Sequence, residues 1–190
     1  MTIQTVLTEQ EKINILNYVR SVIANKLDPS MTISETLQGD YYEIEGACFV
    51  TLKTKTNELR GCIGHILPVE PLGENLKNNA IQAAFHDPRF SPLSSLEELN
   101  NLTIDISILS PLKTIESYQE FIIGTHGIIL SQNNRSALFL PQVAVEQNWD
   151  VPTTLTYLSQ KAGLPPLAWQ ENKTTFQVFE ALVFSEENHS

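Results

Sequence analysis

Cysteine is scarce in this sequence, which has only Cys48 and Cys62 among its 190 residues. The two do not form a CxxC pair, so we expect no structural zinc site and no metal requirement for folding. Two cysteines also cannot supply the three-cysteine cluster of a radical-SAM enzyme. The first residues lack a basic segment followed by an apolar run, so we expect no export signal, a cytoplasmic location and two reduced, unlinked thiols.

Basic residues are also few. The 12 Lys and Arg stand against 22 Asp and Glu, which gives a formal net charge of −10. A mainly electrostatic grip on nucleic acid needs a basic surface, so we do not expect nucleic acid as a partner. A local basic pocket remains compatible with an acidic chain, and Arg60, Arg89 and Arg135 are its candidates. No apolar run reaches the length of a transmembrane helix.

Several signatures of known catalytic and cofactor sites are missing from the sequence. We find no phosphate-cradling glycine loop, no GxSxG elbow, no HExxH pair and no dinucleotide fingerprint. We therefore expect no cofactor. Three classes of function stay open: an enzyme or enzyme component, a non-catalytic binding module, and a purely structural domain.

The spacing of apolar residues predicts helices and strands that interleave along the chain. We expect helices over residues 9–26, 71–85, 96–100, 141–147 and 152–162, and strands over residues 47–54, 59–64, 102–108, 128–131, 137–140 and 175–184. Tight turns join several neighbouring strands, which favours an α+β fold over a doubly wound one. The prediction is a mixed, mainly antiparallel sheet with flanking helices, in a single domain spanning residues 1–190.

The hexapeptide Leu-Arg-Gly-Cys-Ile-Gly at residues 59–64 is the most informative segment. Because side chains alternate along a strand, Arg60 and Cys62 are predicted to project on the same side. A cation beside a thiol favours the reactive thiolate, and Gly61 and Gly64 allow other groups to approach closely. The alternative is a glycine-tight hairpin around a half-buried, inert cysteine.

A base near Cys62 would complete a nucleophile pair. His65 follows the hexapeptide directly, while His86 and His126 could approach the thiol only through the fold. We take Cys62 and His86 as the candidate catalytic residues and His126 as a candidate binding residue. Each histidine alone is better explained as a hydrogen-bonding residue than as a catalyst.

The segment Asp87-Pro88-Arg89-Phe90 also has two interpretations. In the first, Asp87 bonds backbone N–H groups of a turn, and Arg89 pairs with Asp87 or with another carboxylate at the surface. In the second, Arg89 joins Arg60 as a fork that binds a carboxylate or phosphate. Gln142 is a further candidate, whose amide either enters a pocket or bonds backbone near a helix start.

The hexapeptide resembles the signature of the AMMECR-type domain family, known in microbes as protein A of the AmmeMemoRadiSam system. Further segments match in the order that the family has them: residues 46–52, 83–90, 106–111, 126–127, 140–144, 148–150 and 161–164. The resemblance covers nearly the whole chain and implies two lobes of unequal size. It also implies partner proteins, because the system name joins this family to a Memo-like protein and a radical-SAM protein.

We favour a binding or accessory component that works with Memo-like and radical-SAM partners. It would act through a cleft between the lobes that contains the hexapeptide and takes a partner or a small anionic ligand. The binding residues would be Arg60, Gly61, Gly64, Asp87, Arg89, His126 and Gln142. The alternative is an enzyme with Cys62 as nucleophile or redox thiol, Arg60 as anion anchor and a histidine as proton carrier.

Overall fold

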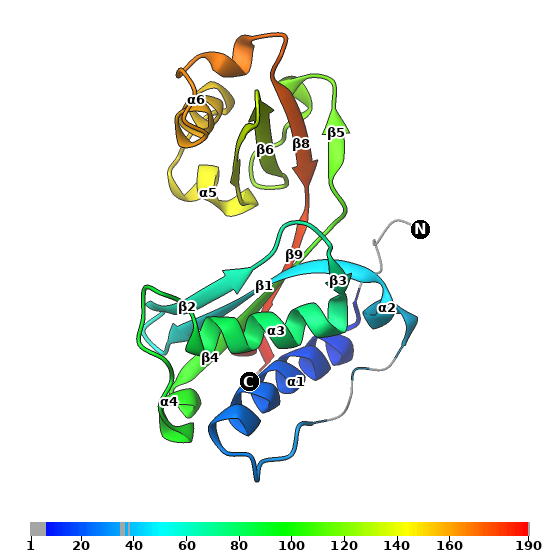
Figure 1. Ribbon diagram of the computed structural model, residues 1–190, viewed down its shortest axis with the longest axis vertical. Coiled ribbons are helices and arrows are strands. Elements are labelled where there is room, and N and C mark those ends of the chain that lie inside the picture. Colours follow the sequence, from blue (N-terminus) through cyan, green and yellow to red (C-terminus); the bar gives the residue numbers. More distant parts are fainter. Residues whose placement is uncertain (1–6, 35–36, 38, 190) are drawn as a thin grey trace. The chain divides into compact units, whose positions relative to one another are not determined.

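The computed structural model describes residues 7–34, 37 and 39–189 of the chain, which form two compact units (Figure 1). Unit 1 comprises Met1–Leu109 and Leu182–Ser190, and unit 2 comprises Ser110–Ala181. Strands and helices occur in both units, so the predicted α+β class is confirmed. The strands divide into two separate sheets, where the sequence predicted one.

Unit 1 is built on a five-stranded sheet in the order β2-β1-β4-β9, with β3 paired to β1. Its strands are β1 (Glu45–Thr54), β2 (Leu59–Gly64), β3 (Glu70–Pro71), β4 (Leu102–Leu109) and β9 (Ala181–Ser185). Its helices are α1 (Glu9–Leu27), α2 (Asp40–Glu43), α3 (Leu72–Phe85) and α4 (Leu96–Asn100), followed at the end by the 3₁₀ turn η3 (Glu186–His189). The pairings of β1 with β2, β3 and β4 are antiparallel.

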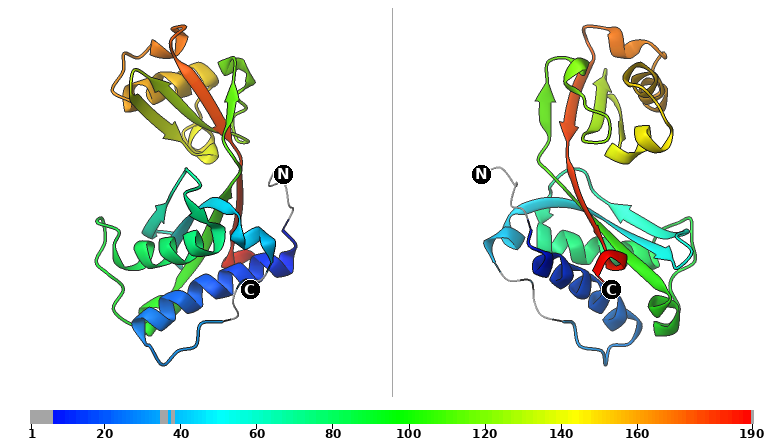
Figure 2. Two further views of the ribbon diagram at one scale, coloured as in Figure 1. Left: turned by 45° about the vertical axis from the view of Figure 1, so that its right-hand side comes forward. Right: turned by 180° about the vertical axis from the view of Figure 1, so that it is seen from behind.

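The helices α1 and α3 pack on one face of this sheet. In Figure 1 α3 crosses in front of the strands, and from behind, in Figure 2, the strands lie in front of it. In β4, Leu102, Ile104, Ile106 and Ile108 are buried in the core that α1 and α3 share with the sheet. The residues between them are only half-buried. This is the predicted alternation of a strand with one covered face.

Unit 2 has its own sheet in the order β5-β8-β6-β7. The strands are β5 (Lys113–Ile115), β6 (Gly127–Gln132), β7 (Arg135–Phe139) and β8 (Thr175–Phe179), with the helices α5 (Pro141–Glu146) and α6 (Val151–Lys161) and the 3₁₀ turns η1 (Tyr118–Glu120) and η2 (Ala168–Gln170). The pairings of β5 with β8, β6 with β7 and β6 with β8 are antiparallel. A separate apolar core joins α6 to the sheet through Leu155, Leu158, Ile128, Leu130 and Phe176.

The final strand requires a correction. The sequence predicted one strand over residues 175–184, but the run breaks at Glu180 into β8 of one sheet and β9 of the other. Exposed Glu180 pairs its backbone with Ser110, whose N–H donates to the Glu180 carbonyl at 2.8 Å. The apolar pattern is the same on both sides of the break, so it could not reveal the change of sheet. In the described part of the chain, no helix is both long and apolar enough to cross a bilayer.

Candidate functional site

The hexapeptide forms β2, which is the terminal strand of the sheet in unit 1 and the second strand of a hairpin, as predicted. The antiparallel register places Cys62 opposite Thr51 and Gly64 opposite Phe49 of β1. The strand therefore has one edge bonded to β1 and one edge without a neighbouring strand among those described.

The two glycines are required by close contacts within the chain. A Cβ atom at Gly61 would lie 2.2 Å from the carbonyl oxygen of Ala83 in α3. At Gly64 it would lie 2.3 Å from the ring of Phe49 and 2.5 Å from the Cys48 carbonyl oxygen. Gly61 thus lets α3 rest directly on β2. The predicted close approach is present, and the approaching groups belong to the protein itself.

Arg60 lies at a bulge of β2 and pairs with α4. The register shifts between Leu52 and Lys53, so that Arg60 has no residue opposite it. Its Nε and Nη2 donate to Glu98 Oε1 at 3.1 and 2.6 Å, while its Nη1 is buried without a partner. A bulge interrupts side-chain alternation, so the premise that put Arg60 and Cys62 on one side does not hold here.

The carboxylate of Glu98 holds Arg60 and the start of α4 together. Its Oε2 accepts the backbone N–H and the hydroxyl of Ser94 at 3.0 and 3.2 Å. Burial alone would raise the pKa of Glu98. The hydrogen bonds from Ser94 and from the Arg60 guanidinium outweigh burial, and the pKa lies below its usual value.

Asp87 and Arg89 seal the free edge of β2 at Cys62. The Cys62 N–H donates to Asp87 Oδ2 at 2.9 Å, and Arg89 Nη2 donates to the Cys62 carbonyl at 3.1 Å. Arg89 also binds both carboxylate oxygens of Asp87, at 3.0 and 2.7 Å. The pair offers one acceptor and one donor to the strand edge, as a neighbouring strand would.

The charge state of this pair follows from the same contacts. Hydrogen bonds from Arg89 hold the pKa of the Asp87 carboxyl well below its usual range, although the group is buried. Of the alternatives that the sequence left open for Arg89, the structure shows the pairing with Asp87. In the alternative interpretation Arg60 and Arg89 would together bind an anion. Each of them already forms an ion pair within the chain, Arg60 with Glu98 and Arg89 with Asp87.

The thiol of Cys62 lies on the face of the unit 1 sheet opposite α1 and α3, which we call the open face. It comprises Phe49, Thr51, Lys53, Cys62, Thr103, Asp105 and Ser107, all half-buried. The Thr51 hydroxyl donates to Cys62 Sγ at 3.2 Å. Lys53 forms an ion pair with Asp105 of the neighbouring strand β4, with Nζ and Oδ2 2.8 Å apart.

Cys48 lies on the other face. Its thiol donates to Asn75 Oδ1 of α3 at 3.2 Å, and burial raises its pKa to about 12. Cys48 and Thr51 are three positions apart on one strand and so face opposite ways. Because Cys62 lies beside Thr51, the two thiols are separated by the sheet, and both are free.

A buried amide cluster between α3 and β1 was missed by the sequence reasoning. Asn75 and Asn79 are fully buried, and both bond Cys48. Asn75 Nδ2 also donates to Glu70 at 2.9 Å and lies 3.5 Å from His65 Nδ1. The sequence signal that could have indicated this cluster is the pair of asparagines one helical turn apart, next to the apolar face of α3.

The histidines do not complete a nucleophile pair with Cys62. His65 and His86 are exposed, and within the described residues neither imidazole hydrogen-bonds the thiol. In unit 2, His126 Nδ1 accepts the Ile122 N–H at 3.1 Å, and Gln142 is exposed near the start of α5. Among the described residues, no three or more His, Cys, Asp or Glu side chains are grouped so that they could hold a metal ion.

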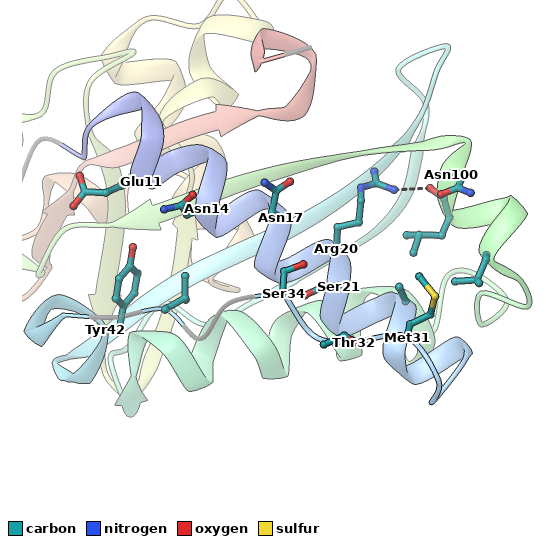
Figure 3. A pocket seen from close by; sticks show the side chains of 14 residues that line it. Glu11, Asn14, Asn17, Arg20, Ser21, Met31, Thr32, Ser34, Tyr42 and Asn100 are labelled. Atoms are coloured by element: carbon teal, nitrogen blue, oxygen red, sulfur yellow. Dashed lines mark hydrogen bonds between the residues drawn. The ribbon is translucent and has the colours of Figure 1, made fainter.

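A pocket of about 1030 Å³ lies elsewhere in unit 1 (Figure 3). Asn14, Asn17 and Arg20 of α1 line it together with Tyr42 and Asn100, and no residue of the hexapeptide does. Arg20 is already engaged there, because its guanidinium binds Glu186 and the carbonyl oxygens of Leu99 and Leu102. The pocket is therefore distinct from the candidate site.

Fold and site define an α+β protein with a glycine-rich signature on a sealed edge strand. The family model for AMMECR1 matches residues 16–184. This chain belongs to the AMMECR1 family, as the resemblance of its hexapeptide indicated.

Relatives and a solved structure agree with this assignment. Protein NEQ441 of Nanoarchaeum equitans is 39% identical over 171 residues, which cover 82% of this chain and 94% of that protein. Protein MK0488 of Methanopyrus kandleri is 40% identical over 188 residues, covering 95% and 91%. The crystal structure of the uncharacterised protein PH0010 from Pyrococcus horikoshii superposes with a TM-score of 0.80 at 32% identity, covering 94% of this chain and 93% of that one.

Proposed function

We propose that this protein is a binding or accessory component, and that a partner docks on the open face beside the hexapeptide. The observation that carries the proposal is the engagement of the nearby ionic groups within the chain. Arg60 is held by Glu98, and Asp87 and Arg89 hold each other and the backbone of Cys62. Groups fixed in this way make a rigid platform, whereas a catalytic thiol would need a free base nearby.

The open face offers several kinds of side chain to a partner. It combines an aromatic ring, a thiol, hydroxyl groups and the Lys53–Asp105 ion pair on a rigid sheet. The resemblance to protein A of the AmmeMemoRadiSam system makes the Memo-like and the radical-SAM protein the proposed partners. Two free thiols suit a reducing compartment, so we propose that the complex is cytoplasmic.

Binding to separately purified Memo-like and radical-SAM proteins from the same organism tests the proposal. Lys53→Glu should weaken binding about tenfold or more, because it breaks the ion pair on the open face and reverses its charge. Lys77→Glu is the matched control, since Lys77 is also ion-paired, to Glu74, but lies on α3. Absence of binding to both proteins, or equal loss in the two variants, would contradict the proposal.

A second candidate function is an enzyme with Cys62 as nucleophile or redox thiol. The Thr51 hydroxyl donates to this thiol, and the cationic Arg89 binds the same residue through its carbonyl. These two contacts are the observation that favours this second function.

Alkylation at neutral pH separates the two functions and has an internal control. Cys48 is buried with its pKa raised to about 12, so it should react only after unfolding. Cys62 is half-buried on the open face, so we expect it to react in the native protein, but more slowly than a free cysteine. A rate many-fold above that of a free thiol, lost in Thr51→Val, would favour the enzyme.

A further inference from the structure

Unit 2 carries a surface of stacked aromatic rings that the proposed function does not use. Tyr157 of α6 stacks on Trp149 with ring centroids 4.4 Å apart and planes at 17°, and Trp149 contacts Phe139 of β7 at 5.8 Å. Lys161, one turn after Tyr157 on α6, lies 4.9 Å from the centroid of the Phe139 ring. Tyr157 is 46% exposed, so its ring is available to another molecule.

This aromatic row adjoins the edge of a sheet. Of the strands that the structure describes in unit 2, β7 is the last in the order β5-β8-β6-β7. A two-residue turn, Asn133-Asn134, with φ of 49° and 62°, joins it to β6 and pairs Gln132 with Arg135. The backbone groups of alternate residues then point away from β6, which assigns Ser136 and Leu138 to the free edge.

A contact from α6 supports this assignment. Lys161 Nζ donates to the Leu138 carbonyl at 2.9 Å, which is possible only if that carbonyl points outward. The rest of the edge has main-chain donors and acceptors of the kind that pair with an added strand. Ser136 is exposed, in keeping with an edge that another chain can reach.

Two basic residues lie at this edge, although the chain carries −10 overall. Arg135 donates to the Gly163 carbonyl and Lys161 to the Leu138 carbonyl. Within the described part of the chain, neither cation forms an ion pair with a carboxylate. Two uncompensated cations thus flank the aromatic row and the strand edge.

We propose that this surface, which we call the β7 surface (Arg135, Ser136, Leu138, Phe139, Trp149, Tyr157 and Lys161), binds an extended acidic segment of a partner protein. The segment would add a strand to β7 through the backbone of Ser136 and Leu138. An acidic side chain of the segment would pair with Lys161 in place of the Leu138 carbonyl, and an apolar side chain would pack on the ring of Tyr157. Two cations on an acidic protein are too few to hold a nucleic-acid strand.

The proposal is tested by selecting, from a displayed library of short random peptides, those that bind the full chain. It does not depend on the function proposed for the open face. We expect the selected sequences to be rich in Asp or Glu next to apolar residues. Trp149 is the reporter in a Trp169→Phe background, because the sequence has only two tryptophans and Trp169 is buried. A synthetic copy of a selected peptide should change the Trp149 emission, and methylation of its alternate backbone amides should abolish the change.

Charge-reversal variants on the two edges of the same sheet provide the control. Lys161→Glu should weaken peptide binding about tenfold or more, whereas Lys113→Glu, on the opposite edge strand β5, should leave it within about twofold. Tyr157→Phe should retain binding and Tyr157→Ala should reduce it. The proposal is overturned if no peptide is selected, if selected peptides ignore Lys161 and Tyr157, or if single-stranded oligonucleotides quench Trp149 at lower concentration than the peptides.

Discussion

The ion pair between Arg60 and Glu98 gives the sharpest test of what the signature arginine does. The side chains are 17% and 30% exposed, so the pair is mostly but not fully buried. Breaking a buried pair by removing one partner costs about 3–5 kcal/mol, and an exposed pair contributes about 0.2–1 kcal/mol. We expect Arg60→Ala to lower the free energy of unfolding by about 2 kcal/mol, between these limits.

Two features of the contact keep this figure below the buried limit. Glu98 retains two hydrogen bonds from Ser94 when the guanidinium is gone, so its carboxylate is not stranded. Removing Arg60 also removes the buried Nη1 that has no partner. An unsatisfied buried donor costs about 1–3 kcal/mol, and its loss offsets part of the damage.

A double-mutant cycle with Arg60→Ala, Glu98→Gln and the double variant isolates the interaction. Urea unfolding followed by circular dichroism should give a coupling energy of about 1–2 kcal/mol. The exposed pair Lys77–Glu74, with side chains 41% and 56% exposed, is the matched control and should couple by less than about 0.5 kcal/mol. A coupling near zero for Arg60 and Glu98 would refute the structural role and return Arg60 to the candidate binding residues.

Three further predictions follow from other contacts. Gly61→Ala should destabilise the fold by about 1–3 kcal/mol in the same urea assay. Gly73→Ala is its control: Gly73 lies in α3, where an added Cβ would make only ordinary contacts, so this change should stabilise the fold by up to about 1 kcal/mol. Folding lowers the pKa of Asp87, so the ionised carboxylate stabilises the fold fully above pH about 4, and this stabilisation is lost as the pH falls further. The difference in the free energy of unfolding between wild type and Asp87→Asn should therefore narrow below pH about 4. Arg20→Lys should lower the melting temperature by several degrees, since lysine cannot reproduce the two-oxygen contact with Glu186.

Elements with a strong local pattern could be predicted from the sequence. The α1 helix begins at Glu9 because Thr8 and Glu11 form the expected capping box. The alternation of β4 gave its two faces correctly. The break of the last strand at Glu180 could not be foreseen in the same way, because both halves are apolar and sheet membership depends on pairing with residues far away in the chain.

The candidate site was harder to predict for the same reason. The local pairing of Asp87 with Arg89 was foreseen because the two residues are two positions apart. Their bonds to the backbone of Cys62 were not foreseen, since that contact spans 25 residues or more. The bulge at Arg60 was invisible as well, because it arises from the register with β1.

The contacts of the hexapeptide leave one group without a structural task. The guanidinium of Arg60 bonds Glu98, Gly61 makes room for α3, the backbone of Cys62 is bonded by Asp87 and Arg89, and Gly64 makes room for Phe49. The Cys62 thiol instead lies half-buried on the open face, with one hydrogen bond from a threonine. The thiol is therefore the polar group of the hexapeptide that stays available to a molecule on the open face.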